Sequence, residues 1–360
     1  MPPLLRFLLN RLLMIPVTLL VVTAVIYGAI MFSPPYLRAT LYMSAKEQEG
    51  LYQLTPEQIE MVARPIVARR HLDAPYPVQY GLWLSQILRG EWGYGPSIRD
   101  EVLPYLLRRS PVTAELTLYS LLFFIPLGLF SGVIAARRKD RVVDRGFRLA
   151  AYCATAIPPL ILAAVLLSIF YVGINWFPPE RLSTTNNLLV QEANFHQYTG
   201  LITLDGLLNN RPDISLDAAR RLVMPVITVS LLHWATLARV TRTTMLDELQ
   251  KEYVTAARAR GVSERALVWR HAFRNTLAPA LNSSALSASS LLTGILVVER
   301  LFAFHGISDI FNPAWVAPDA PVAMGFIVYC VTVVTLMMFI LDLLMAIFDP
   351  LVRAGVLSDG

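Results

Sequence analysis

Charged side chains are scarce in this sequence. Only 16% of its 360 residues are Asp, Glu, Lys or Arg, whereas 55% are hydrophobic. An ordinary soluble domain has roughly 25% charged residues, and a disordered chain has low hydrophobicity. The composition therefore excludes disorder and is typical of a protein that spans a membrane.

Cysteine is nearly absent. The two cysteines, Cys153 and Cys330, both fall inside apolar runs, which excludes the disulfide framework of a small secreted domain. The five histidines are scattered, and none is paired at i, i+4 or lies close to a cysteine in the sequence. A zinc site needs such clustered ligands, so we expect no metal and no cofactor.

The signatures of ATP binding and of hydrolysis are missing as well. None of the three lysines, Lys46, Lys139 and Lys251, follows a glycine, as the lysine of a Walker A loop does. Neither a Gly-x-Ser-x-Gly elbow nor a His-Glu-x-x-His helix occurs. We expect no catalytic residue and a protein that is not an enzyme.

The sequence contains six stretches free of Asp, Glu, Lys and Arg. Roughly 20 apolar residues cross a bilayer as a helix, and these stretches are that long or nearly so. In lipid, only a helix or a closed barrel pairs all of its backbone polar groups. We predict an all-α membrane protein with six transmembrane helices. The stretches are residues 12–37, 116–136, 149–179, 222–238, 275–298 and 320–341.

The basic residues predict the orientation. Two precede the first stretch, six lie between the second and third, and eight lie between the fourth and fifth. Cytoplasmic loops carry an excess of Lys and Arg, so both termini are predicted to be cytoplasmic. Residues 33–114 carry nine basic residues and argue the other way. Long loops weigh little in this rule, and the orientation is kept.

The chain is expected to have two parts. Residues 1–110 hold the first transmembrane helix and a large extracytoplasmic segment, and residues 111–360 hold a five-helix core. In the outer segment, Thr55, Pro56 and Gln58 are typical of a capped helix start. A second helix, from Tyr76, has apolar residues at helical spacing and ends before Gly90. This second helix either lies on the membrane surface or packs on the protein's own outer face.

Some polar residues lie in or beside the apolar stretches. Glu115 and Asp342 are near the ends of such stretches, and we expect them to reach interfacial water rather than to serve a function. Arg239 and Arg242 either pack against the loop that follows or anchor their helix by reaching the membrane surface. We expect His233 to pack between helices.

The long cytoplasmic link at about residues 247–275 predicts two helices with a sharp break. Gly261 suits the left-handed position that ends a helix, and Ser263 can cap the next helix, with Glu264 in its first turn. Such a helix-turn-helix would project from the membrane. Ala256 and Ala257 would keep it slim enough to enter a groove on a partner. Tyr253, Val254 and Val262 are candidates for apolar contact.

This link resembles a known family. Tyr253-Val-Thr-Ala-Ala-Arg-Ala-Arg-Gly261, followed by His271-Ala-Phe-Arg-Asn275, looks like the "EAA" loop of binding-protein-dependent ABC import permeases of the oligopeptide/dipeptide/nickel type. The resemblance covers nearly the whole chain. Further matching segments are 77–84, 88–93, 113–118, 125–128, 176–178 and 349–353.

The resemblance implies a type I ABC importer permease fold in a bacterial or archaeal inner membrane. It implies pairing with a second related permease, with two ABC ATPase subunits and with an extracytoplasmic substrate-binding protein, and no nucleic acid. Transport would proceed by alternating access. The residues implied to couple transport to the ATPase are Tyr253, Ala256, Ala257, Gly261, Val262 and Glu264.

The sequence also departs from the family. Thr255 replaces the glutamate that names the loop, and residues 183–216 form an Asn-rich outer insertion. The family's Glu-x-x-Phe-x-x-x-Gly-x-Gly begins here at Glu299 but has Ser308 for its second glycine. Peptides are the default cargo, with nickel or oligosaccharides as alternatives. Other functions left open are an ion-driven secondary transporter and a membrane scaffold or receptor.

Overall fold

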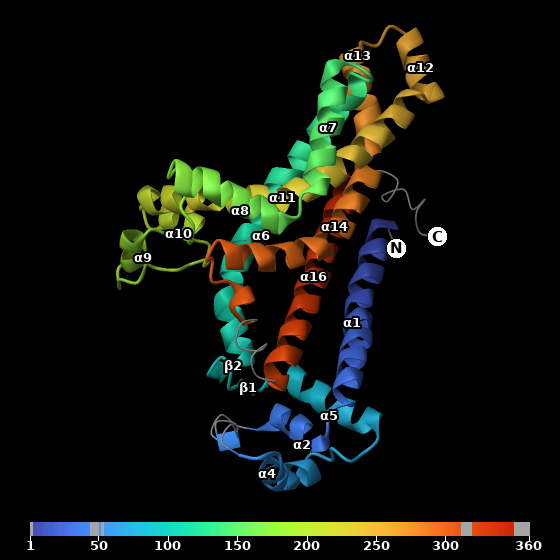
Figure 1. The fold of residues 1–360 in the computed structure, drawn as a ribbon. Coiled ribbons are helices and arrows are strands. Elements are labelled where there is room, and N and C mark those ends of the chain that lie inside the picture. The colour runs from blue at the N-terminus through green and yellow to red at the C-terminus, as the bar shows by residue number, and fades with distance from the viewer. Residues whose placement is uncertain (1–2, 44–49, 52–53, 311–318, 349–360) are drawn as a thin grey trace. The chain divides into compact units, whose positions relative to one another are not determined.

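A computed structural model describes residues 3–43, 50–51, 54–310 and 319–348 (Figure 1). Most of these residues are helical, so the predicted all-α class is confirmed. Within these ranges the only strands are β1 (Tyr94–Gly95) and β2 (Asp100–Glu101), which pair antiparallel with Tyr94 opposite Glu101. The predicted matching segment 349–353 lies outside the described residues.

The chain forms two compact units. Unit 1 comprises Met1–Arg11, Pro111–Gly306 and Leu336–Gly360, and unit 2 comprises Leu12–Ser110 and Ile307–Thr335. The functional division into residues 1–110 and 111–360 stays a prediction.

The apolar stretches fold largely as helices. Four helices are long and apolar enough to span a membrane: Leu12–Ile30 in α1 (Pro3–Ile30), α6 (Val102–Arg137), α11 (Pro212–Leu249) and Ala320–Leu343 in α16 (Ala320–Phe348). A fifth span results if α7 (Val142–Ala156) and the segment Pro159–Gly173, bent by 102°, form one broken crossing. The remaining stretch lies in α14 (Phe273–Leu301). Four or five spans are therefore found among the described residues, and the sixth stays a prediction.

The bend in the third stretch has a clear cause in the sequence. Ile157 precedes Pro158 and Pro159, and a residue before proline is driven out of the helical region. Ile157 is extended, with φ −90° and ψ 116°. A new helix, α8 (Pro159–Leu166), then starts with Pro159 in its first turn and continues as the π-helix η2 (Leu167–Gly173).

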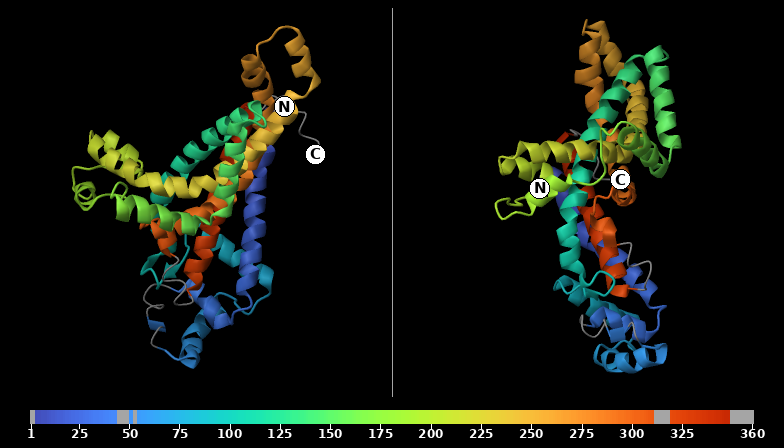
Figure 2. Two further views of the ribbon diagram at one scale, coloured as in Figure 1. Left: turned by 45° about the horizontal axis from the view of Figure 1, so that its top comes forward. Right: turned by 60° about the vertical axis from the view of Figure 1, so that its left-hand side comes forward.

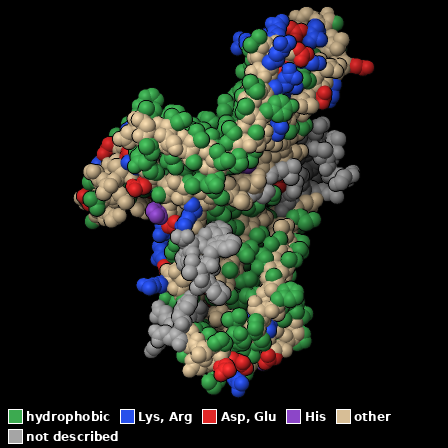
Figure 3. Space-filling model, viewed as in Figure 1, with side chains coloured by type: hydrophobic (Ala, Val, Ile, Leu, Met, Phe, Trp, Pro, Cys, Tyr) green, Lys and Arg blue, Asp and Glu red, His purple; other side chains and the backbone are tan. Residues whose placement is uncertain are grey.

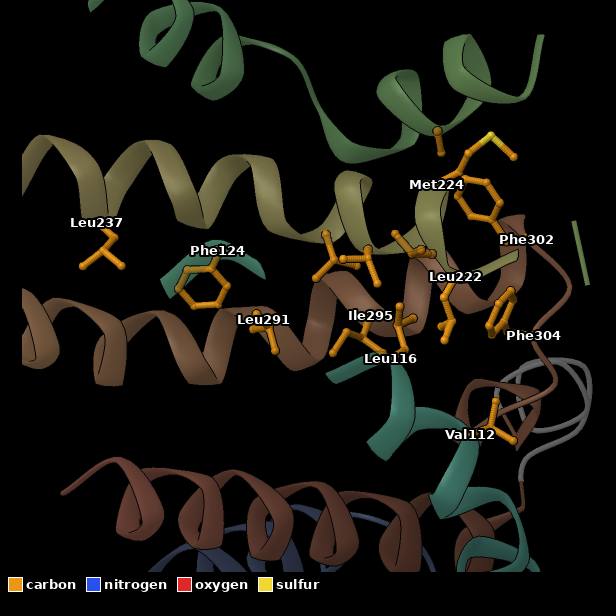
Figure 4. Packing of buried hydrophobic residues seen from close by; sticks show 14 of the residues in the cluster. Val112, Leu116, Phe124, Leu222, Met224, Leu237, Leu291, Ile295, Phe302 and Phe304 are labelled. Atoms are coloured by element: carbon orange, nitrogen blue, oxygen red, sulfur yellow. The ribbon is translucent and has the colours of Figure 1, made fainter. Parts of the chain in front are cut away.

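Unit 1 is built around the packing of α6, α11 and α14 (Figure 4). Apolar side chains from the three helices interdigitate along their length, and Phe302 and Phe304 close the cluster after α14 ends. The labelled members are Val112, Leu116, Phe124, Leu222, Met224, Leu237, Leu291, Ile295, Phe302 and Phe304.

Two glycines of α6 let α11 pack closely against it. A Cβ at Gly128 would lie 2.8 Å from Cδ2 of Leu237, and one at Gly132 would lie 2.6 Å from the carbonyl oxygen of Ala238. Glycines four residues apart allow close packing of membrane helices. The Gly-x-x-x-Gly spacing therefore sets the crossing of these two helices.

Unit 2 contains α1 from Leu12 onward, the small helices α2 (Pro35–Arg38), η1 (Ala39–Tyr42) and η4 (Ile307–Ile310), and the longer helices α4 (Pro56–Arg69) and α5 (Tyr76–Leu88). The predicted cap of α4 is confirmed, because Thr55 N–H donates to Gln58 Oε1 at 2.9 Å. The predicted end of α5 is confirmed by Gly90, which has φ +83°.

The helix α5 packs on the protein itself. Trp83 is only 2% exposed, and its ring centroid lies 5.2 Å from that of Tyr27 on α1. Tyr76 and Tyr80 stack beside them with centroids 5.9 Å apart. Of the two placements considered from the sequence, packing on the protein's own surface is the one found, although Leu88 remains exposed.

We predict that Gly132→Ala destabilises the protein. Its methyl group would meet a backbone oxygen that cannot move aside, and such overpacking typically costs about 1–3 kcal/mol. The matched control is Gly146→Ala on α7, where a Cβ meets no atom within 4 Å and helix propensity improves by up to about 1 kcal/mol. Thermal unfolding in detergent measures both. Equal unfolding midpoints for the two variants would contradict the proposed contact.

Candidate functional site

The predicted helix-turn-helix is present at one end of unit 1. It consists of α12 (Glu252–Ala259), a turn at Gly261, and α13 (Glu264–Ala266), which continues through the π-helix η3 (Leu267–Ala272) into α14. We call residues 252–266 the α12–α13 hairpin. Figures 1 and 2 show the hairpin projecting at the far end of unit 1 from the helices α9 (Thr184–Val190) and α10 (Ile202–Leu208).

Gly261 has the predicted left-handed conformation, with φ +81°. Gly261 N–H donates to the carbonyl of Arg258 at 3.0 Å, and Val262 N–H donates to that of Ala257 at 3.2 Å. These two bonds are the Schellman pattern that ends a helix. Ser263 occupies the predicted N-cap position of α13, but its side chain makes no capping hydrogen bond.

The hairpin has a small apolar core of its own. Val254 is 0% exposed, Ala257 is 2% exposed, and both pack with Leu267. They lie three residues apart on α12 and therefore share the face turned toward the chain. Both side chains thus face the inside of the hairpin in this structure, and the role of Ala257 in coupling stays a prediction.

The outward surface of the hairpin is formed by other residues. Tyr253, Ala256, Gly261 and Glu264 are exposed, and Val262 is half-buried. Arg258 Nε donates to Glu264 Oε1 at 2.6 Å across the turn, and this bond lowers the pKa of Glu264. Both side chains of this pair are well exposed, so its contribution to stability is small.

Basic side chains gather at this end of unit 1 (Figure 3). They come from the hairpin and the start of η3 and α14, and from the turn between α6 and α7. A surface so rich in exposed cations suits an aqueous or headgroup environment, not hydrocarbon. The exposed residues are Arg137, Arg138, Lys139, Arg141, Arg145, Arg258, Arg260, Arg265, Arg270 and Arg274.

The base of the hairpin is fixed to two long helices. Val268 and Ala272 of η3 are buried with Val133 of α6 and Met245 of α11. The ring of Trp269 adds an aromatic contact to Phe130 of α6, with centroids 5.6 Å apart. The base of the hairpin therefore packs directly on the long apolar helices α6 and α11.

Arg242 has a role that neither sequence interpretation anticipated. Its guanidinium donates to both oxygens of the fully buried Asp144, at 2.6 and 2.8 Å, and so joins α11 to α7. His233 is 5% exposed beside Phe124, with ring centroids 5.6 Å apart. The prediction that His233 packs between helices is confirmed.

The opposite end of unit 1 is tied by buried carboxylates. Glu115 is 1% exposed, and its oxygens accept bonds from Arg181 Nη2 at 2.7 Å and from Thr203 N–H at 2.8 Å. The expectation that Glu115 reaches interfacial water is wrong, because the outer insertion folds back and covers it. Asp342, near the C-terminal end of α16, is also buried, at 6% exposed, so the same expectation is wrong for it.

The insertion is ordered by a second carboxylate. Asp217, near the start of α11, accepts from Ser183 N–H at 2.8 Å, Asn186 Nδ2 at 2.8 Å and Arg221 Nε at 2.9 Å. The part of the 183–216 insertion that precedes α11 therefore folds against it with the short helices α9 and α10, and residues 212–216 form the start of α11 itself.

The motif that begins at Glu299 also has a structural explanation. Glu299 is fully buried, and Thr113 Oγ1 donates to it at 2.5 Å. A Cβ at Gly306 would lie 2.3 Å from Glu299 Oε1. The glutamate and the glycine of the motif are thus in contact. Ser308, which stands where the family has its second glycine, is itself buried.

We predict that Arg181→Met lowers the free energy of unfolding by about 3 kcal/mol, because it leaves the buried Glu115 without its cation. Arg211→Met is the matched control, since its partner Asp213 is 54% exposed and its loss should change stability little. Thermal unfolding in detergent tests both. The double variant Arg181→Met/Glu115→Gln should be more stable than Arg181→Met alone, because it removes the unpaired buried charge. A double variant that unfolds at a lower temperature than Arg181→Met would contradict the pairing of Arg181 with Glu115.

Comparisons with known proteins agree with these features. The family described as binding-protein-dependent transport system inner membrane component matches residues 125–354. The di/tripeptide transport system permease protein DppB of Pseudomonas aeruginosa is 32% identical over 79% of this chain and 83% of its own length. The oligopeptide transport system permease protein AppB of Bacillus subtilis is 29% identical over 78% of this chain and 81% of its own length.

The chain belongs to the family of binding-protein-dependent transport system inner membrane components. It is a multi-pass inner-membrane permease subunit of an ABC importer, and it works with a substrate-binding protein and with separate subunits that hydrolyse ATP.

Proposed function

We propose that this permease carries peptides and supplies half of their translocation pathway, the other half coming from a second related permease. The names of its relatives, which are di/tripeptide and oligopeptide permeases, support a peptide cargo. In this proposal the chain crosses the membrane six times, both termini are cytoplasmic, and two ATPase subunits bind from the cytoplasm. The 183–216 insertion then lies outside.

The α12–α13 hairpin is proposed as the element that docks on an ATPase. The observation that carries this proposal is a projecting, cation-rich hairpin whose base packs on α6 and α11. Tyr253, Ala256, Gly261, Val262 and Glu264 would meet the ATPase. Ala257 would contribute from inside, by holding α12 against Leu267.

Coupling follows from this arrangement. When two ATPases close on ATP, the grooves that hold the hairpins move, and a rigid hairpin carries this movement into its membrane helices. The result is a shift between inward-open and outward-open states. ATP and loaded binding protein can drive that shift only by as much as their affinities for the two states differ.

Docking can be tested at Gly261, where a Cβ would meet no atom within 4 Å and any effect is conformational. Gly261→Val forces a branched side chain into left-handed backbone at a cost of about 1–2 kcal/mol. We expect less ATPase to co-purify and peptide uptake to fall. Gly261→Asn, which tolerates this conformation, should retain more of both.

Asn187→Ala in the outer insertion is the control and should leave ATPase association unchanged. If Gly261→Val kept full ATPase association and full uptake, the hairpin would not be the docking element.

Orientation is tested by cysteine labelling after Cys153 and Cys330 are replaced. Arg141→Cys should react with an impermeant maleimide only from the cytoplasm, and Asn187→Cys only from outside, because the positive-inside rule places them on opposite sides. Labelling of Arg141→Cys from outside in intact cells would overturn the proposed topology.

A further inference from the structure

Three elements meet around one buried carboxylate at the base of the hairpin. Glu248, in the last turn of α11, is 6% exposed. Its oxygens accept from Lys251 Nζ at 2.5 Å, from Tyr253 OH of α12 at 2.6 Å and from Asn275 Nδ2 of α14 at 3.4 Å. Asn275 Nδ2 also donates to Tyr253 OH at 3.0 Å. We call these four residues the Glu248 junction.

The backbone alone connects the hairpin loosely to the long helices. Only Gln250 and Lys251 separate α11 from α12. On the other side, the π-helix η3 stands between α13 and α14, and π-helical turns are rare and occur often at functional sites. Apolar packing of η3 holds the base of the hairpin on α6 and α11, and bonds between side chains would add a direct connection from α12 to α11 and α14.

The Glu248 junction can make this connection, because its bonds join α11 to α12 and to α14. A buried carboxylate is stable only when its oxygens are paired, so moving α12 or α14 away from α11 is costly because Glu248 would lose the bond from Tyr253 or from Asn275. Burial and the bond to Glu248 raise the pKa of Tyr253 to about 12. Its hydroxyl therefore remains a donor at neutral pH.

Tyr253 links the junction to the surface. Its side chain is 36% exposed on the outward side of the hairpin, while its hydroxyl is bonded to Glu248 inside. A protein pressing on the hairpin at Tyr253 would therefore act directly on the carboxylate that joins α11, α12 and α14.

We propose that Glu248 is a positioning residue for energy coupling, which locks the hairpin to α11 and α14 through Lys251, Tyr253 and Asn275. A displacement of the hairpin is then transmitted to both membrane helices instead of being absorbed in the Gln250–Lys251 link and η3. This inference rests on the proposed docking of the hairpin on the ATPase. It assigns transmission of the movement to a different residue from those that make the contact.

The test uses the complete transporter, with its ATPases and binding protein, in proteoliposomes. ATP hydrolysis and uptake of a labelled peptide are measured together, and ATPase association is measured by co-purification. We expect Glu248→Ala to keep ATPase association within about twofold of wild type and to lower the peptide transported per ATP at least about fivefold. Glu248→Gln keeps an acceptor oxygen at the same reach and should recover at least half of the wild-type ratio.

Two further variants make the result specific. Tyr253→Phe removes one hydroxyl and should also lower the amount of peptide transported per ATP. The double variant Glu248→Ala/Tyr253→Phe should lose little more than Glu248→Ala alone, because the two residues act as one unit. Asp247→Ala removes the neighbouring exposed acid on α11 and should leave the ratio unchanged.

The outcomes separate this inference from the docking proposal. A normal ratio in both Glu248→Ala and Tyr253→Phe, with the ATPase still bound, would overturn the role of Glu248 and leave docking intact. Loss of ATPase association in Tyr253→Phe and in Glu248→Gln would also overturn it, because the junction would then serve docking and not transmission. If Glu248→Ala cannot be purified, Tyr253→Phe decides the question: a lowered amount of peptide transported per ATP supports the role of Glu248, and a normal amount overturns it.

Discussion

The close contact between α6 and α11 is the constraint on which the rest of unit 1 depends. Gly132 lets the backbone of α6 approach that of α11, and Gly128 makes room for the side chain of Leu237, while α7 and α14 also pack against α11. This helix has 38 residues and is about 57 Å long at 1.5 Å per residue. One end holds the outer insertion through Asp217, and the other end holds the hairpin through Glu248. A single helix therefore links the two ends of the unit.

Buried, hydrogen-bonded acids lie near the ends of the helices of unit 1, and apolar side chains pack between these ends. Four buried acids mark where separate elements meet, namely Glu115, Asp144, Glu248 and Glu299. Each is bonded to a residue from another element. Such ties are specific because a buried carboxylate that loses its partner is costly. Apolar contacts allow helices to slide, whereas these bonds keep the ends in register, as rigid-body transport requires.

The sequence predicted features that depend on local chemistry. The helical stretches, the caps at Thr55 and Gly90 and the left-handed turn at Gly261 follow from backbone preferences that act over a few residues. The inward position of Ala257 and the burial of Glu115 depend on which segments fold back onto them, and no local pattern carries that information. The Gly-x-x-x-Gly spacing of α6 is a local signal of close helix packing that the sequence analysis did not use. The partners of Glu248 come from the α11–α12 link, from α12 and from α14, and no local pattern indicates that they meet.

The central claim is that the outward face of the hairpin meets the ATPase, while the opposite end of unit 1 does not. A photo-crosslinking amino acid placed at Ala256, which is exposed on α12, tests it most directly in the assembled transporter. The comparison site is Leu188 on α9, which is 63% exposed. The account predicts a crosslink to the ATPase from position 256 and none from position 188. Absence of the crosslink at 256, or an equal yield at both sites, would contradict it.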